Sequence, residues 1–245
     1  MARALSKLGY CSRSRAKELI RTGRVSLNGK IRRDPETPVS WKLAEIAIDG
    51  EVILAQKKIY LMLNKPRGVV TTASDEKGRD TVYGILGDRA STGMIRPWVA
   101  PVGRLDKASE GLLLLTNDSE WAARIAAPET HLDKTYRVQV GTMADEPFIQ
   151  VLCRGVKTKD GEVLRANEAR LLRAGQKNCW LEIVLDEGKN RQIRRMMEAL
   201  GVDVLRLVRV AIGPLQLGDL AKGQCRVLTM DEKRMLDRAM REKSV

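Results

Sequence analysis

The chain has 245 residues, of which 43% are hydrophobic and 31% are charged, and this size predicts two domains with apolar cores. Apolar runs such as residues 112–115 are far shorter than the roughly 20 residues of a membrane helix. Basic residues also interrupt the N-terminal segment where a signal peptide needs an apolar run, so we expect a cytoplasmic protein without a membrane partner. The single histidine, His131, and the lack of Cys-x-x-Cys and Gly-x-Ser-x-Gly patterns argue against a structural zinc site and against a Ser-His-Asp hydrolase.

The net charge of +13 is concentrated at the N-terminus. Residues 1–33 carry +9, and the rest of the chain carries +4. Charge gathered in one segment is typical of a protein that binds a polyanion such as RNA. The alternative is a solvated basic face without a partner, and the folded pattern of the same segment favours the polyanion.

The basic N-terminal segment has the pattern of a folded module rather than of a disordered tail. Apolar residues recur at helical spacing over residues 4–8 and again over residues 16–20, and Ser12 or Ser14 can cap the second helix. Asn28-Gly29 then predicts a tight hairpin, because both residue types accept the positive φ of a type I′ turn. A further strand-like run follows, so we expect two helices on a small sheet.

This segment resembles the S4 RNA-binding domain, which is named after a ribosomal protein and recurs in rRNA-modifying enzymes and some tRNA synthetases. The resemblance rests on residues 11–29, and we place the domain at residues 1–57. The first helix is short for this domain, which indicates either a native start a few residues earlier or a weak first turn. The resemblance implies that basic residues of the second helix contact RNA phosphates, namely Arg13, Arg15, Lys17 and Arg21.

Residues 58–245 alternate between short apolar runs and polar loops, which predicts a mixed α+β body around a mainly antiparallel sheet. Strands are expected at residues 59–64, 69–72, 112–115, 136–140, 181–185 and 205–212. Helices are expected at residues 82–86, 190–200 and 231–243. Two loops rich in Arg, Gly and Ser, at residues 73–80 and 87–100, are candidates to clamp RNA.

Asp106 is the first candidate for a reactive residue. It lies in a glycine-flanked loop directly before the apolar strand at residues 112–115, and a loop at the end of a buried strand is a rigid platform for a side chain. Arg104, two residues away, can help to keep the carboxylate ionised. From this pattern alone, a carboxylate that caps a turn and a carboxylate that reacts are equally good interpretations.

The longer string around Asp106 resembles the signature motif of rRNA pseudouridine synthases. The sequence GRLD at residues 103–106, followed by EGLLLLTND at residues 110–118, is similar to the branch that contains ribosomal small subunit pseudouridine synthase A and large subunit synthases B, E and F. Further motifs follow the family order: KTY at residues 134–136, EGKNRQIRRM at residues 187–196 and, more weakly, KPRG at residues 65–68. The resemblance spans nearly the whole chain.

The resemblance implies an isomerase that converts a uridine of ribosomal RNA to pseudouridine. Such an enzyme breaks the bond between uracil nitrogen 1 and the ribose and rejoins the base through carbon 5. Nothing is oxidised and no group is supplied from outside, so no cofactor and no metal are expected. We expect a monomer whose partner is ribosomal RNA or a ribosomal precursor particle, and we favour 23S over 16S rRNA.

The resemblance also implies roles for individual residues. Asp106 is the nucleophile, with the ribose or the base as its target, and Tyr136 stacks on the uracil and takes the proton from carbon 5. Arg194 is expected to pair with Asp106. The remaining basic residues of these motifs are expected to contact RNA, namely Arg104, Arg191 and Arg195. The alternatives are a half-buried strand tyrosine at position 136 and a phosphate-binding arginine at position 194.

Two other classes of function are weaker. A non-catalytic rRNA-binding or ribosome-assembly protein would explain the basic N-terminal module, but not the ordered appearance of Asp106, Tyr136 and Arg194. A metal-dependent nuclease would need clustered carboxylates.

Overall fold

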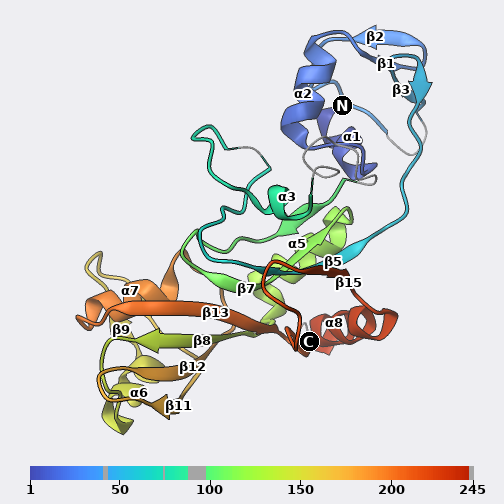
Figure 1. The fold of residues 1–245 in the computed structure, drawn as a ribbon. Coiled ribbons are helices and arrows are strands. Elements are labelled where there is room, and N and C mark those ends of the chain that lie inside the picture. The colour runs from blue at the N-terminus through green and yellow to red at the C-terminus, as the bar shows by residue number, and fades with distance from the viewer. Residues whose placement is uncertain (41–43, 74, 88–97, 243–245) are drawn as a thin grey trace.

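The N-terminal part of the chain forms a small sheet with two helices. The computed structural model describes residues 1–40, 44–73, 75–87 and 98–242 (Figure 1). The sheet has the order β2-β1-β3-β4 and is antiparallel throughout. Its elements are α1 (Ala2–Lys7), α2 (Arg13–Arg21), β1 (Val25–Leu27), β2 (Lys30–Arg32), β3 (Ile46–Ile48) and β4 (Glu51–Val52).

Local sequence explains this N-terminal fold. The Ser12 hydroxyl accepts a hydrogen bond from the Arg15 amide at 3.1 Å, so Ser12 rather than Ser14 caps α2. Asn28 and Gly29 both have positive φ, at 50° and 76°, as the hairpin pattern predicts. Apolar residues of both helices and of β1 and β3 share one buried cluster, which makes the segment a module with its own core.

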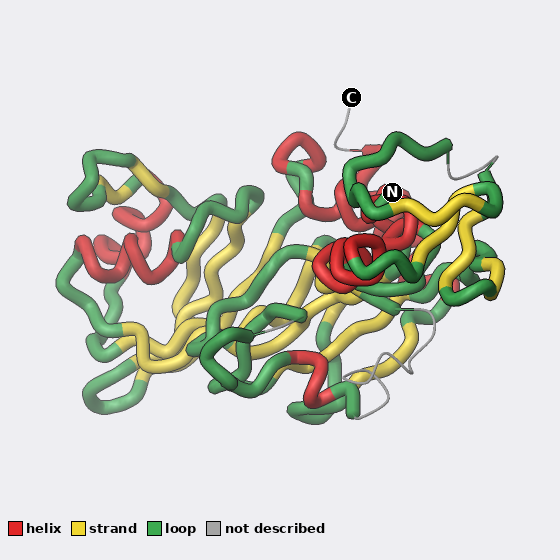
Figure 2. Tube along the Cα trace, turned by 90° about the horizontal axis from the view of Figure 1, so that it is seen from above, coloured by secondary structure: helices red, strands yellow, loops and turns green. Residues whose placement is uncertain are grey.

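The rest of the chain is built on a nine-stranded sheet. Its main path is β11-β12-β8-β13-β7-β5-β15, with β14 beside β13 and β6 beside β7. All pairs are antiparallel except β13 with β7. The strands are β5 (Tyr60–Lys65), β6 (Ala100–Val102), β7 (Glu110–Thr116), β8 (Lys134–Val140), β11 (Glu168–Ala174), β12 (Cys179–Leu185), β13 (Val204–Ile212), β14 (Leu215–Gln216) and β15 (Cys225–Val227). Figure 2 shows these strands side by side across the body.

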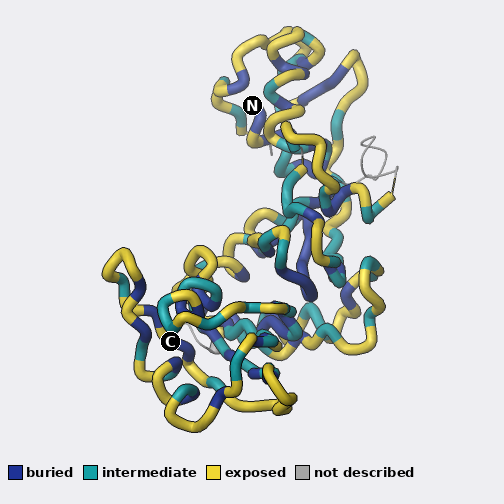
Figure 3. The backbone as a smooth tube through the Cα atoms, turned by 60° about the vertical axis from the view of Figure 1, so that its left-hand side comes forward, coloured by how far each residue is buried: buried dark blue, intermediate teal, exposed yellow. Residues whose placement is uncertain are grey.

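Helices cover the two halves of this sheet differently. Both faces of β5 and β7 are covered, one by α5 and α8 and the other by α3. On β8 and β12, α6 and α7 cover one face. The helices are α3 (Val82–Ile85), α5 (Ser119–Ala126), α6 (Glu146–Arg154), α7 (Gln192–Ala199) and α8 (Met230–Glu242); η1 (Pro128–Thr130) is a 3-10 turn, and β9 (Val156–Lys157) and β10 (Val163–Leu164) form a separate hairpin. Figure 3 shows the buried residues in the interior of the body and the exposed residues on its outer loops.

Most of the predicted elements are present, with local exceptions. Every residue of β7 is buried, in agreement with the fully apolar pattern that predicted this strand. The strand expected at residues 69–72 is reduced to one isolated bridge between Val70 and Thr81. Met235, an apolar residue of the last helix, is 43% exposed. The RNA-clamp prediction for residues 87–100 lies largely outside the described residues, as does residue 243 of the last helix. None of the described helices has the length and apolar character to span a bilayer.

The parallel contact between β7 and β13 depends on Gly111. Its φ of +102° is strained for residues with a side chain, and a Cβ at this position would overlap the backbone carbonyl oxygen of Arg209 and lie 2.8 Å from the Arg209 nitrogen. The close approach joins the two halves of the sheet immediately after the loop that carries Asp106. Glycine at position 111 therefore sets the distance between that loop and β13.

We expect Gly111→Ala to lower the free energy of unfolding by about 3 kcal/mol or more, because it adds a backbone collision to the strain of positive φ. The matched control is Gly161→Ala, since Gly161 also has positive φ (+85°) but a Cβ added there would meet no atom within 4 Å. That variant should lose only about 1–2 kcal/mol. Urea unfolding of both variants checks this, and equal losses would contradict the packing role of Gly111.

Candidate active site

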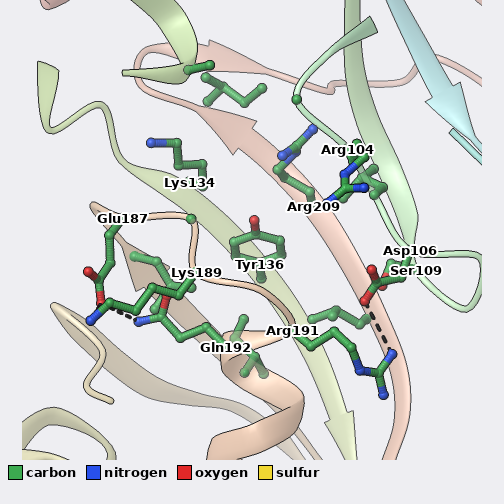
Figure 4. A pocket seen from close by; sticks show the side chains of 18 of the residues that line it. Arg104, Asp106, Ser109, Lys134, Tyr136, Glu187, Lys189, Arg191, Gln192 and Arg209 are labelled. Atoms are coloured by element: carbon green, nitrogen blue, oxygen red, sulfur yellow. Dashed lines mark hydrogen bonds and ion pairs between the residues drawn. The ribbon is translucent and has the colours of Figure 1, made fainter. Parts of the chain in front are cut away.

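A cleft of about 420 Å³ opens on the main sheet where β8 and β13 meet the loop before β7 and the loop before α7. Its lining includes Arg104, Asp106, Tyr136 and Arg191, which come from three separate stretches of sequence (Figure 4). The structure therefore brings four of the predicted site residues together. Arg194 and Arg195 do not line this cleft, and the predicted phosphate contacts of α2 lie on the N-terminal module.

Lys65, the last residue of β5, holds the loop that carries Asp106. The Lys65 side chain is fully buried, and its ammonium donates to the carbonyl oxygens of Pro66 at 3.0 Å, Asp106 at 3.2 Å and Ser109 at 2.8 Å. Burial lowers the pKa of Lys65 to about 8, although the nearby carboxylates of Asp106 and Glu110 oppose that shift. Three N–H donors therefore meet three carbonyl acceptors inside the protein.

Three further hydrogen bonds fix the backbone of the same loop. The Arg194 guanidinium donates to the Ala108 carbonyl at 3.1 Å, and the Gly68 amide donates to the Lys107 carbonyl at 2.7 Å. The Thr71 hydroxyl donates to the Leu105 carbonyl at 2.8 Å. These contacts use the backbone of the loop and leave the Asp106 carboxylate free to face the cleft, so the nucleophile candidate is rigidly placed.

Arg191, rather than Arg194, makes the ion pair with Asp106. One guanidinium nitrogen of Arg191 lies 3.4 Å from a carboxylate oxygen of Asp106, while Arg194 contacts the Ala108 carbonyl instead. The ion pair in this structure is therefore made by the arginine three residues before the predicted Arg194, whose guanidinium still interacts electrostatically with Asp106. The physical reason is that Arg191 lies at the N-cap, at the open end of the helix, whereas Arg194 is one turn inside it and half-buried.

The backbone of Arg191 is unusual. Its φ of 49° and ψ of 33° place it in the left-handed region, which non-glycine residues seldom adopt outside turns and functional sites. This conformation turns the chain between the EGKN segment and α7. The side chains of Asp106 and Arg191 are 37% and 50% exposed, so the ion pair is accessible to a macromolecule.

Tyr136 lies near the middle of the cleft, and cations surround it. Figure 4 shows its hydroxyl pointing into the cavity on the side of Lys134 and Arg209. The Arg209 Nε donates to the Leu112 carbonyl at 2.8 Å, and one of its terminal nitrogens is buried without a partner among the described residues. Lys134 donates to the Asp186 carbonyl at 3.2 Å. The cleft is therefore suited to an anionic ligand.

Sequence reasoning missed three residues of this region as site residues: Lys65, Lys134 and Arg209. Lys65 and Lys134 lie in matched motifs, and Arg209 is a charged residue within a strand-like apolar run, so each carried a signal. Arg195 was predicted to contact RNA, but its guanidinium lies 2.7 Å from carboxylate oxygens of both Asp160 and Glu162. Its charge is thus matched within the protein.

The cations of α2 differ in how far they are available. Arg13, Arg15 and Arg21 are exposed and Lys17 is half-buried. Arg15 pairs with Glu18 at 2.7 Å, and Lys17 lies 3.3 Å from Glu36. Among the described side chains, no group of three potential metal ligands was found.

Comparison with known proteins places this geometry in a family. Residues 59–199 match the family described as RNA pseudouridylate synthase, and residues 2–40 match the S4 domain. The chain belongs to the RNA pseudouridylate synthase family. It is an RNA pseudouridine synthase, an isomerase, with an N-terminal S4 domain, so the fold and enzyme class expected from the sequence are confirmed.

Relatives match this synthase over nearly its full length. It is 37% identical over 237 residues to an uncharacterized RNA pseudouridine synthase of Aquifex aeolicus (strain VF5), which covers 96% of this chain and 92% of the relative. It is 34% identical over 238 residues to ribosomal large subunit pseudouridine synthase B of Bacillus subtilis (strain 168), which covers 96% and 94%. A crystal structure of a pseudouridylate synthase is similar with a TM-score of 0.66 at 29% identity, and the match covers 96% of this chain and 98% of that chain.

We expect the single-turnover rate of the synthase to fall as pH rises through about 8, the pKa of the buried Lys65 ammonium. Deprotonation leaves two N–H donors for three carbonyls and loosens the Asp106 loop. The rate should be measured from pH 6 to pH 10 for the wild type and for Lys65→Arg, whose side chain stays charged throughout. The fall near pH 8 should be absent from the variant, and the same fall in both proteins would assign it to another group.

Stability should change in the opposite direction. Above pH about 8 the folded chain has released the Lys65 proton, while an unfolded lysine keeps its proton up to about pH 10.4. Between these values the unfolded state binds more protons, so the contribution of Lys65 to the free energy of unfolding rises with pH. Urea unfolding of the wild type and of Lys65→Arg at pH 7 and pH 9.5 separates this effect from that of other groups.

Proposed function

We propose that this synthase converts one uridine of ribosomal RNA, with 23S rRNA favoured, using Asp106 as the nucleophile on a base that is flipped into the cleft. The observation that carries the proposal is the ion pair between Asp106 and Arg191, which stands beside Tyr136 on a loop held by Lys65. The choice of 23S rRNA is supported by a relative that is named for the large ribosomal subunit.

The reaction balances without an added reagent. The bond between uracil nitrogen 1 and ribose carbon 1′ breaks, the bond between uracil carbon 5 and carbon 1′ forms, the proton of carbon 5 leaves, and nitrogen 1 gains a proton. The Asp106 carboxylate attacks the ribose or the base and is released unchanged at the end. Arg191 holds this carboxylate in position, and its 3.4 Å contact is expected to shorten once RNA excludes water from the cleft.

Tyr136 is placed to act on the flipped base. Its ring stacks on the uracil, and its hydroxyl, which points into the cavity, takes the carbon 5 proton late in the reaction. The neighbouring cations Arg104, Lys134 and Arg209 line the same cleft and hold the phosphates of the flipped nucleotide. Removing a base from its stack costs a few kcal/mol, which these contacts offset.

The N-terminal module supplies affinity rather than chemistry. We take residues 1–57 as the S4 domain and residues 58–245 as the catalytic domain, with Arg13, Arg15, Lys17 and Arg21 on RNA phosphates. Phosphate contacts position RNA and carry little sequence information. The synthase acts as a monomer in the cytoplasm, on rRNA or a ribosomal precursor particle.

We expect Asp106→Asn to lower the rate of pseudouridine formation by at least about 10³-fold, because a neutral amide is a poor nucleophile. The loop should keep its shape, since Lys65 and Ser109 contact the backbone of residue 106 and not its side chain. Pseudouridines in 23S and 16S rRNA should be mapped by carbodiimide-blocked reverse transcription with wild-type and variant enzyme. Retention of a tenth of the wild-type rate would exclude Asp106 as the nucleophile.

Substitutions of the two arginines should separate their roles. Arg191→Gln removes the partner of the Asp106 carboxylate, so the single-turnover rate at saturating enzyme should fall by about 10²-fold or more while the melting temperature stays near that of the wild type. Arg194→Gln removes the same charge but loses the hydrogen bond to Ala108, so it should chiefly lower stability, by about 1–3 kcal/mol. The reverse pattern would restore Arg194 as the partner of Asp106.

A further inference from the structure

The main sheet carries a second hollow, of about 500 Å³, on the face opposite to the cleft. Successive residues of a strand point to opposite faces, so Tyr136 faces the cleft and its neighbour Arg137 faces this hollow. Strands β8, β12, β13 and β14 and the turn after β14 contribute its lining: Arg137, Trp180, Val208, Val210, Gln216, Leu217, Gly218 and Asp219. None of these residues lines the cleft.

This face of the sheet is open to solvent. Helices α6 and α7 pack against the other face of β8 and β12, through a cluster that includes Val138 and Leu181. Within the described ranges, no helix packs on Arg137, which is exposed, or on Trp180, which is partly exposed. A partly exposed tryptophan on an uncovered sheet leaves apolar aromatic surface available to a ligand.

Arginines surround Trp180 on this face. The Arg206 guanidinium lies over the indole at 5.6 Å from the ring centroid, and Arg173 is opposite Trp180 in the register of β11 and β12. Arg137 and Arg173 have no carboxylate within ion-pair distance among the described residues, since Glu182, across from Arg137, pairs with Arg170. Two positive charges thus remain without a partner beside an aromatic ring.

We propose that this open face binds a single-stranded segment of the RNA substrate, with one base against Trp180 and its phosphates on Arg137 and Arg173. Stacking on an aromatic side chain and guanidinium contacts to the backbone are the usual means by which proteins hold unpaired RNA. The floor formed by Val208 and Val210 suits the apolar face of a base, and the volume admits a nucleoside.

Asp219 also lines the hollow. Its carboxylate repels phosphate and can accept hydrogen bonds from N–H groups of a base, while the Arg137 guanidinium in the same lining attracts phosphate. The bound nucleotide is not the target uridine, because the sheet separates this hollow from the cleft. The inference rests on the proposed function only in taking RNA as the substrate.

The test measures binding of a 5′-fluorescein-labelled single-stranded RNA of about ten nucleotides and mixed sequence to the full chain. Trp180→Leu and Arg137→Glu should each weaken this binding by about 5- to 100-fold, the range expected for loss of one stacked base or of one phosphate contact replaced by repulsion. Arg154→Glu is the matched control, because Arg154 ends α6, on the covered side, and its guanidinium contacts Gln150. It should change the affinity less than twofold.

The same RNA with 4-thiouridine at each position in turn should crosslink to peptides of β8 or β12, and Trp180→Leu should abolish those crosslinks. Unchanged affinity in both variants would overturn the proposal. So would crosslinks confined to α2 and the cleft, or a ribosomal protein whose binding requires Trp180 while RNA binding does not. Unchanged melting temperatures would show that the variants are folded.

Failure of the proposed function would look different. In that case the wild-type enzyme would leave every rRNA uridine unmodified, whatever the state of the open face. If both proposals hold, Trp180→Leu should keep the wild-type single-turnover rate at saturating enzyme, since no residue of the hollow touches the cleft, but should need more enzyme to reach that rate on rRNA with unpaired flanks.

Discussion

One buried ammonium group organises the active site. Lys65 donates all three of its protons to backbone carbonyls, two of which belong to the loop from Asp106 to Ser109. A buried charge without such partners would be strongly destabilising, so the loop and the end of β5 depend on each other. The Asp106 carboxylate is placed by contacts that do not involve the carboxylate itself, which leaves it available for the ion pair with Arg191 and for the reaction proposed above.

The sheet extends this arrangement to the rest of the cleft. The parallel contact between β7 and β13 at Gly111 brings Arg209 alongside the Asp106 loop, and the antiparallel contact between β13 and β8 adds Tyr136. Asp106 and Arg209, which are about 100 residues apart in the sequence, are thus brought together by backbone pairing, whose geometry tolerates little error. A rigid platform of this kind preorganises a site before the substrate arrives.

The fold was largely predictable because its local signals agree. The Asn28-Gly29 hairpin, the Ser12 cap and the all-apolar strand β7 each follow from short-range rules that tertiary packing did not override. The arginine that pairs with Asp106 was not predictable in the same way. Arg191 and Arg194 are both basic, three residues apart and in one motif. Which of them pairs with the carboxylate depends on where α7 begins, since Arg191 lies at its N-cap and Arg194 is half-buried within it.

The remaining misses have related physical causes. Lys65 can be buried because carbonyl groups of two loops accept hydrogen bonds from its ammonium. The direction of such carbonyl groups depends on the fold, so a short stretch of sequence does not predict it. The positive charge of Arg195 is paired with the carboxylates of Asp160 and Glu162, which lie about 35 residues earlier in the chain, in the hairpin of β9 and β10. The open face around Trp180 follows from which helices the chain provides, and strand alternation alone predicts only that such a face has a polar character.

The way in which the Asp106 loop is held has a consequence for how this protein tolerates change. The loop offers Lys65, Gly68 and Arg194 only main-chain oxygen atoms, which every amino acid possesses. Residues 107 and 108 are therefore recognised without regard to their identity, whereas positions 65 and 194 must each present a side-chain N–H donor at the right distance. Mutational tolerance at this site is asymmetric. Substitutions are tolerated at the residues whose main-chain carbonyls accept hydrogen bonds, but not at the distant residues whose side chains donate them.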